Sequence, residues 1–567
     1  MAPNPGGWRR VIRIGLIWGA VAVYLCLVGM VELFAPREIV VGVISLAHAL
    51  LLLTGMAAGL QAGRQRVGST GVTLGRGTLA GAIVGVVVAA LVAVGAHVNL
   101  RAVLASASPD LFAILSFGQG TSATPLIILA GAVAGGVGAV TWLVPPRVRR
   151  PLAIGVAAVF IVGLFQELEQ LLLGEGGVRL AIREIFFTAD GLSPRGAVIA
   201  FVVVEAIILL RSRRKLVARR PLTPLSSKRS RWFRSATWVL VVALVLVVPQ
   251  IAGSFLSQVL VMVGLFTLMG LGLNLEVGFA GLLDLGFVAF FAIGAFTVGV
   301  LTTTGPLNVG HLSFWVAVPI AVVVALIAGV LFGIPVLGIR GDYLAIATLG
   351  FGEITRLMVL SDFLRPWLGG SQGVLSIPKP MLGGFELRGP EQLFYLTLVS
   401  SALVVFVAMR LRDSRLGRAW MAIREDEDVA EAMGINLVNS KLLSYGLGAA
   451  FAGVGGAIFA VMVGSVFPHS FQLLTSINVL ALIVVGGMGS LPGVVVGALF
   501  LVGLPEVLRE FSEFRFLIYG AALILMMQLR PEGLWPAATV KRELHEGEEP
   551  SPLPETPAVA EAKGSDG

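Results

Sequence analysis

The chain alternates between long runs of apolar residues and short polar connections. A helix needs about 20 apolar residues to cross the hydrocarbon core of a bilayer. Runs of this kind predict crossings at 11–33, 39–61, 77–97, 124–145, 152–173, 194–210, 235–249, 254–275, 283–303, 313–336, 343–360, 392–410, 442–464, 474–487, 491–508 and 514–529. The pattern therefore predicts an all-α polytopic membrane protein with about 16 transmembrane segments, some of them broken or re-entrant in the C-terminal half.

Basic residues in the connections predict the orientation of these crossings. Arginines precede the first run and follow the second and fourth, and ten basic residues lie in 211–234 after the sixth. Cytoplasmic loops carry such an excess of Lys and Arg, so both termini are expected in the cytoplasm. We expect a multi-pass protein of the cytoplasmic (plasma or inner) membrane, with 411–441 inside and 361–391 outside.

Changes in composition predict the domain organisation. A six-helix membrane domain of unknown role covers 1–210, and the basic segment 211–234, with its prolines, indicates a cytoplasmic linker. That charge fits a positive-inside anchor, although contact with anionic membrane lipid is an alternative. A second membrane domain covers 235–530, and the Pro- and Glu-rich tail 531–567 is expected to be disordered in the cytoplasm.

Overall composition excludes an ordinary soluble enzyme. Of the 567 residues, 56% are hydrophobic and 13% are charged, against about 25% charged in a typical soluble domain. The net charge of +8 fits basic cytoplasmic loops and gives no reason to expect nucleic-acid binding. No lysine follows a glycine, which excludes a phosphate-binding P-loop, and the five histidines are scattered without metal-ligand spacing. We expect no enzyme activity, no metal site and no cofactor bound directly.

A glycine-rich segment at 270–286 is the first candidate site. Glycine at this density weakens a helix, and a break inside a membrane persists only where protein or a water-filled cavity covers the freed backbone. Transporters bind substrates at such breaks, so the candidate pathway residues are Asn274, Gly278, Gly281, Asp284 and Gly286. Tight helix packing is the alternative, but the carboxylates Glu276 and Asp284 favour a site because they are costly in a membrane.

A second glycine-rich interruption lies at 486–493 and adds Gly487 and Gly489 to the candidate pathway. Two interruptions in one domain suggest a structural repeat with a site between its halves. A tight turn between two helices is the competing explanation.

Segment 417–434 predicts a short amphipathic helix in a cytoplasmic loop. Apolar residues at 419, 422, 423, 429, 430 and 433 share one face, with an interruption at Asp426, and Gly434 is expected to end the helix in a left-handed cap. Five carboxylates between Glu425 and Glu431 suit an anionic bilayer poorly. We therefore expect the helix to dock into a groove of a partner protein.

Residues from about 250 to 530 resemble the LivM-type permease subunit of branched-chain amino-acid ABC transporters. Four segments carry the resemblance, in the same order: GLGLNLEVGFAGLLDLGFVAFFAIGAF (270–296), RGDYLAIATLGFGEITRL (340–357), GRAWMAIREDEDVAEAMGI (417–435) and GGMGSLPGVVVGAL (486–499). The resemblance implies a second, LivH-like permease subunit, two ATPase subunits like LivG and LivF, and an external substrate-binding protein. ATP and Mg would then act through the partner subunits.

The resemblance also assigns the cytoplasmic segment as the helix that couples the permease to its ATPase. The Glu-Ala-Ala-x-x-x-Gly pattern of ABC importers maps to Asp428, Val429, Ala430 and Gly434. The residues expected to carry coupling are Arg418, Arg424, Glu425, Asp428, Ala430, Glu431 and Gly434.

Two departures from the family pattern bear on substrate and on residues 1–210. Asp284 and Phe287 stand where the family commonly has Ser and His, which puts the usual branched-chain substrate in question. Residues 1–210 lie outside the family pattern. A faint echo of 284–294 in 45–55, which keeps Ser45 and His48, is compatible with a degenerate duplication.

The leading interpretation is the permease subunit of an ABC importer for branched-chain amino acids or related small amphiphilic solutes. The main alternative is an ion-coupled secondary transporter that uses Glu276, Asp284 or Glu353. A membrane scaffold or sensor, with 1–210 as its sensing part, is a third possibility.

Overall fold

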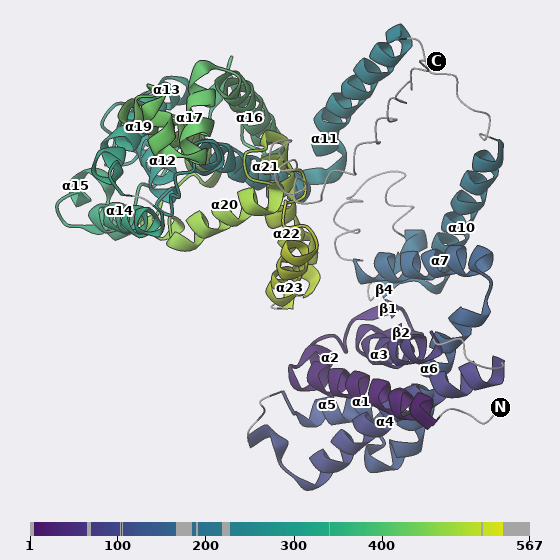
Figure 1. Ribbon diagram of the computed structural model, residues 1–567. Helices are drawn as coiled ribbons and strands as arrows, with labels where there is room; N and C mark the ends of the chain where they lie inside the picture. Colours follow the sequence, from purple (N-terminus) through teal and green to yellow (C-terminus); the bar gives the residue numbers. More distant parts are fainter. Residues whose placement is uncertain are drawn as a thin grey trace, which may run out of the picture. The chain divides into compact units, whose positions relative to one another are not determined.

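The computed structural model describes residues 5–64, 70–102, 104, 106–165, 184–188, 191–217, 227–339, 341–511 and 514–536. The chain forms two compact units, Met1–Leu240 and Val241–Gly567, and each is described by itself. Figure 1 labels the elements of both units, which are almost entirely helical in the described residues.

The first unit combines long apolar helices with one small sheet. Its elements are α1 (Pro5–Leu27), α2 (Met30–Leu33), β1 (Glu38–Val40), β2 (Ile44–Ser45), α3 (Leu46–Gly63), α4 (Thr70–His97), η1 (Leu100–Ala102), α5 (Pro109–Leu115), η2 (Gly120–Ala123), α6 (Thr124–Leu143), α7 (Pro146–Leu164), β3 (Phe187–Thr188), β4 (Gly191–Leu192) and α10 (Pro194–Val217). The sheet has the order β2-β1-β4-β3, with β1 antiparallel to β2 and parallel to β4. This sheet was not predicted: residues 38–45 fall in an apolar run that was expected to be wholly helical.

Small residues let the helices of the first unit approach closely. A Cβ atom at Gly59 of α3 or Gly81 of α4 would collide with backbone atoms of Gly135 on α6. Side-chain contact between α3, α4 and α6 is therefore partly replaced by contact between backbones, as in many membrane helix pairs.

The second unit contains the predicted break and the predicted cytoplasmic segment. Its helices and strands are α11 (Ser227–Leu273, whose start lies in the first unit), the π-helix η3 (Asn274–Phe279), α12 (Val288–Thr302), α13 (Phe314–Gly333), η4 (Ile334–Val336), α14 (Asp342–Leu360), α15 (Arg365–Leu368), η5 (Gly370–Gln372), β5 (Met381–Leu382), β6 (Phe385–Glu386), α16 (Pro390–Arg412), α17 (Arg415–Glu425), α18 (Glu427–Ala432), α19 (Leu437–Val463), η6 (Pro468–Ser470), α20 (Leu473–Gly486), α21 (Leu491–Ala498), the π-helix η7 (Leu499–Gly503), α22 (Leu504–Val507), η8 (Leu508–Phe511) and α23 (Phe514–Leu529). Helix α19 packs against both α12 and α13 at the centre of the unit.

Helix α13 illustrates how these sequences satisfy both a protein core and a bilayer. Small residues at every fourth position are buried: Ala317, Ala321, Ala325, Gly329 and Gly333. On the opposite side, Val323, Ile327 and Leu331 are each at least half exposed. Because apolar side chains gain nothing from exposure to water, this face is expected to contact lipid, whereas the small face admits α19.

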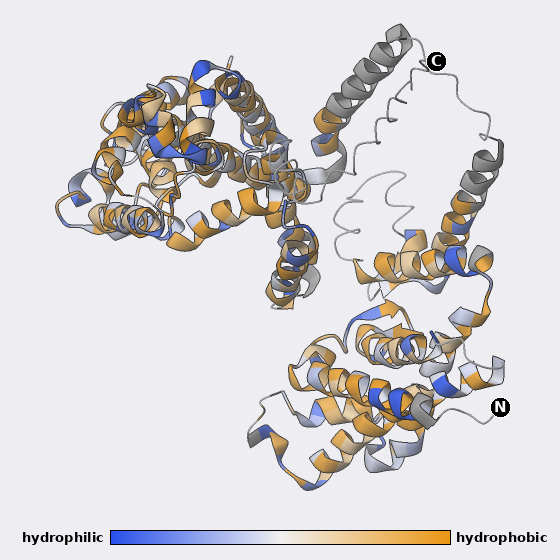
Figure 2. Ribbon diagram, viewed as in Figure 1, coloured by the Kyte–Doolittle hydropathy of each residue, from blue (hydrophilic) through white to orange (hydrophobic). Residues whose placement is uncertain are grey.

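Apolar residues dominate the helices of both units (Figure 2). In the described residues, 10 helices are long and apolar enough to cross a membrane, and three shorter apolar helices accompany them. These findings agree with a polytopic membrane protein, while the number of 16 crossings stays a prediction. The predicted crossings 235–249 and 254–275 correspond to two helical stretches within α11, which meet at a kink where Gly253 has a non-helical backbone (φ 77°, ψ −179°).

The predicted linker and tail are more ordered than expected in their described parts. Helix α10 continues to Val217 and α11 begins at Ser227, so the linker 211–234 is helical at both ends, and 218–226 lie outside the described residues. The start of the predicted disordered tail packs back onto α20. The amides of Leu534 and Trp535 donate to the carbonyls of Val485 and Gly486 at 2.8 and 2.9 Å. Residues 537–567 lie outside the described residues.

Segment 361–391, which was predicted to face outward, is anchored by Lys379. Its Nζ donates to the carbonyls of Val461 and Met462 at 2.6 and 2.8 Å, near the end of α19. A cation is favourable there because unpaired carbonyls give the C-terminal end of a helix negative character. Burial lowers the pKa of Lys379, and the charge of Glu386 opposes that shift.

Candidate functional site

The glycine-rich segment after α11 breaks the helix as predicted. Residues Asn274–Phe279 form the π-helix η3, and the chain is then non-helical until α12 begins at Val288. All of η3 is buried, and its backbone finds new partners: the Leu275 carbonyl accepts from the amide of Ala280 and from Ser444 Oγ, both at 3.2 Å. Satisfying the freed backbone with protein groups is what allows such a break within an apolar helix.

The two glycine-rich motifs, more than 200 residues apart in sequence, meet at Asn274. Asn274 Oδ1 accepts a hydrogen bond from the amide of Gly489 at 2.9 Å. A Cβ atom at Gly278 would lie 2.8 Å from that same nitrogen. Gly487 (φ 113°) lies instead against the backbone of Trp535, where its lack of a side chain admits the last described segment.

The carboxylates Glu276 and Asp284 are both buried, with 0% and 2% of their surface exposed. They interact with each other, and Asp284 Oδ1 accepts from the amide of Gly286 at 2.7 Å. Neither oxygen of Glu276 makes a well-formed hydrogen bond with a described residue. Gly448 of α19 lies against this carboxyl, since a Cβ there would collide with Glu276 Oε1. No basic side chain among the described residues forms an ion pair with either carboxyl, and two such buried groups are costly, which fits a functional more than a purely structural role.

Gly281 and Gly286 are sites of close approach. Gly281 has a φ of +74°, and the side-chain stem of Arg424 from α17 covers it. A side chain at Gly286 would strike the Thr348 carbonyl of α14. Two cavities of this unit have volumes of about 320 and 400 Å³. Both are lined by residues outside the predicted pathway set. The structure thus places Gly278 and Gly281 beside the predicted coupling segment, a position that sequence reasoning did not foresee.

The predicted coupling helix 417–434 is two helices, which corrects the single continuous helix. Helix α17 ends at Glu425, Asp426 is extended (φ −159°, ψ 115°), and α18 follows at once. Asp426 Oδ1 accepts from the amides of Asp428 and Val429 and so caps α18. The interruption of the apolar pattern at Asp426 was the sequence signal for this break, because Asp favours the N-cap over the helix interior.

The apolar residues of these two helices face different surroundings. Trp420, Ile423 and Ala430 are almost completely buried, and Trp420 Nε1 donates to the Ser440 carbonyl at 2.8 Å. Val429 and Met433 are 58% and 80% exposed. The apolar residues that were predicted to share one face are therefore divided between an inward face, which packs within the protein, and an outward face.

The remaining coupling candidates lie at the surface of this segment. Arg418, Glu425, Asp428, Glu431 and Gly434 are exposed. Gly434 has a φ of +86°, and the amide of Ile435 donates to the Ala430 carbonyl at 3.1 Å, which confirms the predicted left-handed cap. Glu427 instead faces inward, where its Oε1 lies 2.7 Å from the Nζ of the buried Lys441.

Comparison with known proteins identifies the family of this fold. The family described as branched-chain amino acid transport system / permease component matches residues 255–527. The permease protein LivM of Salmonella typhimurium is 40% identical over 307 residues, which cover 50% of this chain and 71% of LivM. The LivM protein of Escherichia coli is 41% identical over 306 residues, 50% of this chain and 70% of its own length. The chain belongs to this permease family.

The high-affinity branched-chain amino acid transport system permease protein LivH of Salmonella typhimurium is also similar. It is 25% identical over 287 residues, which cover 47% of this chain and 90% of LivH. No solved structure matched the chain. Family membership makes this protein a membrane permease component and not an enzyme, in agreement with the sequence analysis.

Sequence reasoning did not recognise that Glu353 and Arg356 form a pair. Helix α14, a candidate membrane span, carries Glu353 and Arg356 as an ion pair one turn apart. Their side chains are 44% and 25% exposed, and Arg356 borders a small recess next to Phe471. Charges within a membrane span usually face protein or water and not lipid. The i, i+3 spacing of opposite charges was the available signal, but Glu353 was considered only as an ion site.

Proposed function

We propose that this protein is a transmembrane subunit of an ABC importer in the cytoplasmic membrane, driven by ATP hydrolysis in partner subunits. The observation that carries the proposal is the contact between α17 and η3. Arg424 Nη1 donates to the Gly278 carbonyl at 2.8 Å, and its stem lies over Gly281. A movement of the cytoplasmic helices would therefore be transmitted directly to the break in a membrane helix.

The outward face of α17 and α18 supports docking of an ATPase subunit. Two exposed apolar side chains, Val429 and Met433, lie among the exposed carboxylates Glu425, Asp428 and Glu431. Such a surface fits a groove with an apolar floor and basic rims, as in helix-in-groove recognition. The buried pair of Glu427 and Lys441 fixes α18 against the start of α19, so that a push on α18 moves α19. ATP and Mg would act only in the partner.

Substrate recognition is assigned to the pair on α14. Relatives are named as permeases for branched-chain amino acids, and such a substrate is a zwitterion with an aliphatic side chain. Glu353 and Arg356 present both signs of charge within one turn, and Arg356 lines a small recess together with the apolar residues Val359 and Phe471. We infer that an ammonium group meets Glu353 and a carboxylate meets Arg356, because bidentate Arg–carboxylate contacts are strong.

The remaining partners follow from the relatives. The similarity to both LivM and LivH supports pairing with a second, LivH-like permease subunit across the pathway. An external binding protein would deliver the substrate to the outward side, where segment 361–391 is expected. The predicted pathway residues then support the moving end of the pathway: Asn274, Gly278, Gly281, Asp284, Gly286, Gly487 and Gly489. The two carboxyls of this region, Glu276 and Asp284, are buried.

The experiment is ATP-dependent uptake of radiolabelled leucine by the full complex reconstituted in vesicles. Glu353→Gln and Arg356→Gln should each lower uptake by about tenfold or more, since each removes a charged hydrogen bond worth roughly 1.5–3 kcal/mol. Glu386→Gln, in the ion pair with Arg388 outside the membrane helices, is the matched control and should transport normally. Uptake driven by an ion gradient without ATPase subunits would instead establish the secondary-transporter alternative.

A further inference from the structure

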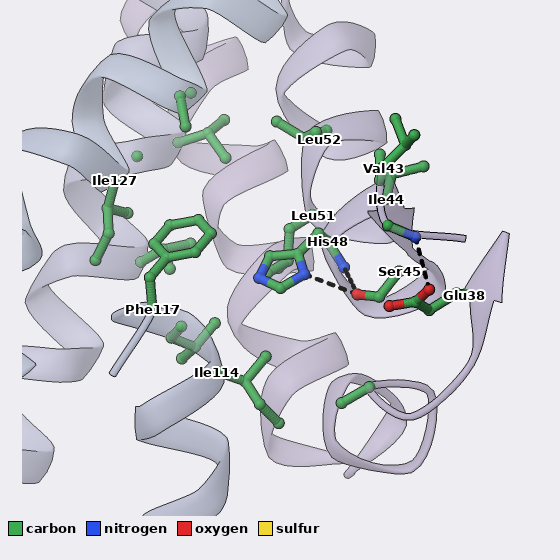
Figure 3. A pocket seen from close by; sticks show the side chains of 18 residues that line it. Glu38, Val43, Ile44, Ser45, His48, Leu51, Leu52, Ile114, Phe117 and Ile127 are labelled. Atoms are coloured by element: carbon green, nitrogen blue, oxygen red, sulfur yellow. Dashed lines mark hydrogen bonds between the residues drawn. The ribbon is translucent and has the colours of Figure 1, made fainter. Parts of the chain in front are cut away.

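The first unit contains a cavity of about 650 Å³ that the transport function does not use. The β1–β2 turn, α3, α4, α5 and the start of α6 surround it, and most lining residues are aliphatic, such as Leu52, Val88 and Ile127 (Figure 3). Its size lies within the range of small-molecule sites, roughly 300–1,000 Å³. An aliphatic body of a few carbon atoms would fit against these walls.

Polar groups gather on one side of this cavity. Glu38, Ser45 and His48 line it together (Figure 3). Ser45 Oγ and His48 Nδ1 are hydrogen-bonded at 2.7 Å, and Glu38 Oε2 accepts from the amide of Gly42 at 2.8 Å. His48 Nε2 is buried and has no hydrogen-bond partner among the described residues. A buried polar atom without a partner is costly, so a ligand that reaches Nε2 would be stabilised.

The aromatic wall beside His48 supports a built site. The ring of Phe117 stacks on His48 with 5.0 Å between centroids and 11° between planes. Phe117 also has a φ of +51°, which is unfavourable for an aromatic residue. Strained residues of this kind gather at ligand sites, where the surrounding structure holds them in place. The stack fixes the imidazole plane and hence the direction of Nε2.

The charge of the cavity indicates the kind of ligand. Glu38 is the one acidic residue in the lining, and none of the described lining residues is Lys or Arg. Its carboxylate attracts a cation, while a ligand carboxylate or phosphate would be repelled by Glu38 with no Lys or Arg among the described lining residues to offset that charge. An apolar tail alone would leave His48 Nε2 unsatisfied.

We propose that this cavity binds a small aliphatic ammonium compound. The alkyl group lies between α3, α4 and α6, and the polar head interacts with Glu38 and His48. The proposal concerns the first unit alone and does not depend on transport by the second. It assigns a ligand-binding role to residues 1–210, whose role the family resemblance leaves open.

The test is binding of 3-methylbutylamine to the full-length protein in phosphatidylcholine nanodiscs, measured by calorimetry. Its neutral isostere, 3-methylbutan-1-ol, is the comparison ligand. The amine should bind about tenfold more tightly than the alcohol, because only the amine makes a charge-assisted contact. Glu38→Gln should remove that difference and leave alcohol binding unchanged. The glutamine oxygen can still accept from Gly42, so folding is expected to be preserved.

A pair of tryptophan variants locates the binding. Leu52 and Leu53 are neighbours on α3 and are equally exposed, at 37%, but only Leu52 lines the cavity. Leu52→Trp should abolish binding of both ligands, whereas Leu53→Trp should bind like the unaltered protein. Equal affinities for amine and alcohol, unaffected by Glu38→Gln, would overturn the proposal in favour of a lipid-filled cavity. Binding that survives in a folded Leu52→Trp protein, or no binding of the amine at all, would also overturn it.

Discussion

At the scale of single residues, Arg424 makes the contact that links the cytoplasmic helices to the break in the membrane helix. It joins the cytoplasmic helix α17 to η3 through one hydrogen bond to a backbone carbonyl and through packing over Gly281. The acceptor is a main-chain atom of η3, so the contact depends on the side chain of Arg424 and not on any side chain of η3. Its loss should therefore affect coupling before it affects folding.

We predict that Arg424→Gln leaves assembly with the ATPase intact but lowers ATP-driven uptake by about tenfold, the order expected for one charged hydrogen bond. Gly281→Ala should act in the same direction, since its Cβ would lie 2.8 Å from the arginine stem in a positive-φ conformation. The readout is uptake per ATP hydrolysed. Arg415→Gln is the control: Arg415 is an exposed arginine of the same helix that is not among the coupling candidates. Normal uptake in both test variants would exclude this contact as a coupling route.

Gly434 tests backbone conformation separately from packing. It has a φ of +86°, and a Cβ there would meet nothing within 4 Å. The cost of a side chain is thus purely conformational, about 1–2 kcal/mol for most residues. We expect co-purification of ATPase subunits to fall least in Gly434→Asn, more in Gly434→Ala and most in Gly434→Val, because Asn tolerates the left-handed region best. Equal losses in all three variants would mean that the cap does not position α18.

At the scale of elements, the division of the cytoplasmic segment into α17 and α18 separates two tasks. Helix α17 buries Trp420 and Ile423 and carries Arg424, whereas Val429 of α18 and Met433 just after it are exposed. The turn at Asp426 sets the angle between them. A rigid α18 is therefore a requirement for presenting the docking surface.

Ala430→Pro should disrupt α18 and prevent docking. The Ala430 amide donates to the Asp426 carbonyl at 3.0 Å, and a proline would remove this bond and clash, at about 3 kcal/mol or more. The membrane helices are unchanged, so insertion should be normal while ATPase association and substrate-stimulated hydrolysis fall. Ala430→Gly, which costs only about 1 kcal/mol, should have a mild effect. Full assembly and coupling of the proline variant would remove the mechanical basis of the ABC proposal.

At the scale of the whole molecule, the proposed function requires the coupling surface and the face that receives substrate to lie on opposite sides of the membrane. The coupling surface of α17 and α18 must be cytoplasmic, and the anchored segment 361–391 must face outward. Docking of the ATPase subunit and delivery of the substrate both depend on this arrangement.

Cysteine labelling in sealed cells tests the topology after Cys26→Ser. On the cytoplasmic side, Asn439 at the start of α19 is a suitable position for a cysteine because it is exposed, whereas the neighbouring Ser440 is buried. Asn439→Cys should be protected from an impermeant external reagent, and Ser371→Cys, exposed in η5, should be labelled. Labelling of Asn439→Cys from outside would contradict both the orientation and the docking surface.

The sequence by itself determined the membrane class, most of the long helices, the glycine-rich break after α11 and the permease family. These features are local: apolar runs of bilayer length, glycine-rich interruptions and collinear motifs are readable without knowing which helices touch. The left-handed cap at Gly434 belongs to the same group. The turn at Asp426 was visible as a break in periodicity, but it was interpreted as a flaw in one helix.

Only the tertiary structure decided which of these features act together. It joined Asn274 to Gly489 and Arg424 to Gly278, and it turned Val429 outward and Trp420 inward. It also formed the cavity around Glu38 and His48 from a small sheet that the apolar pattern had hidden. The physical reason is that contacts between distant segments depend on the close approach of helix backbones. Glycines permit that approach, but their spacing does not specify the partner helix.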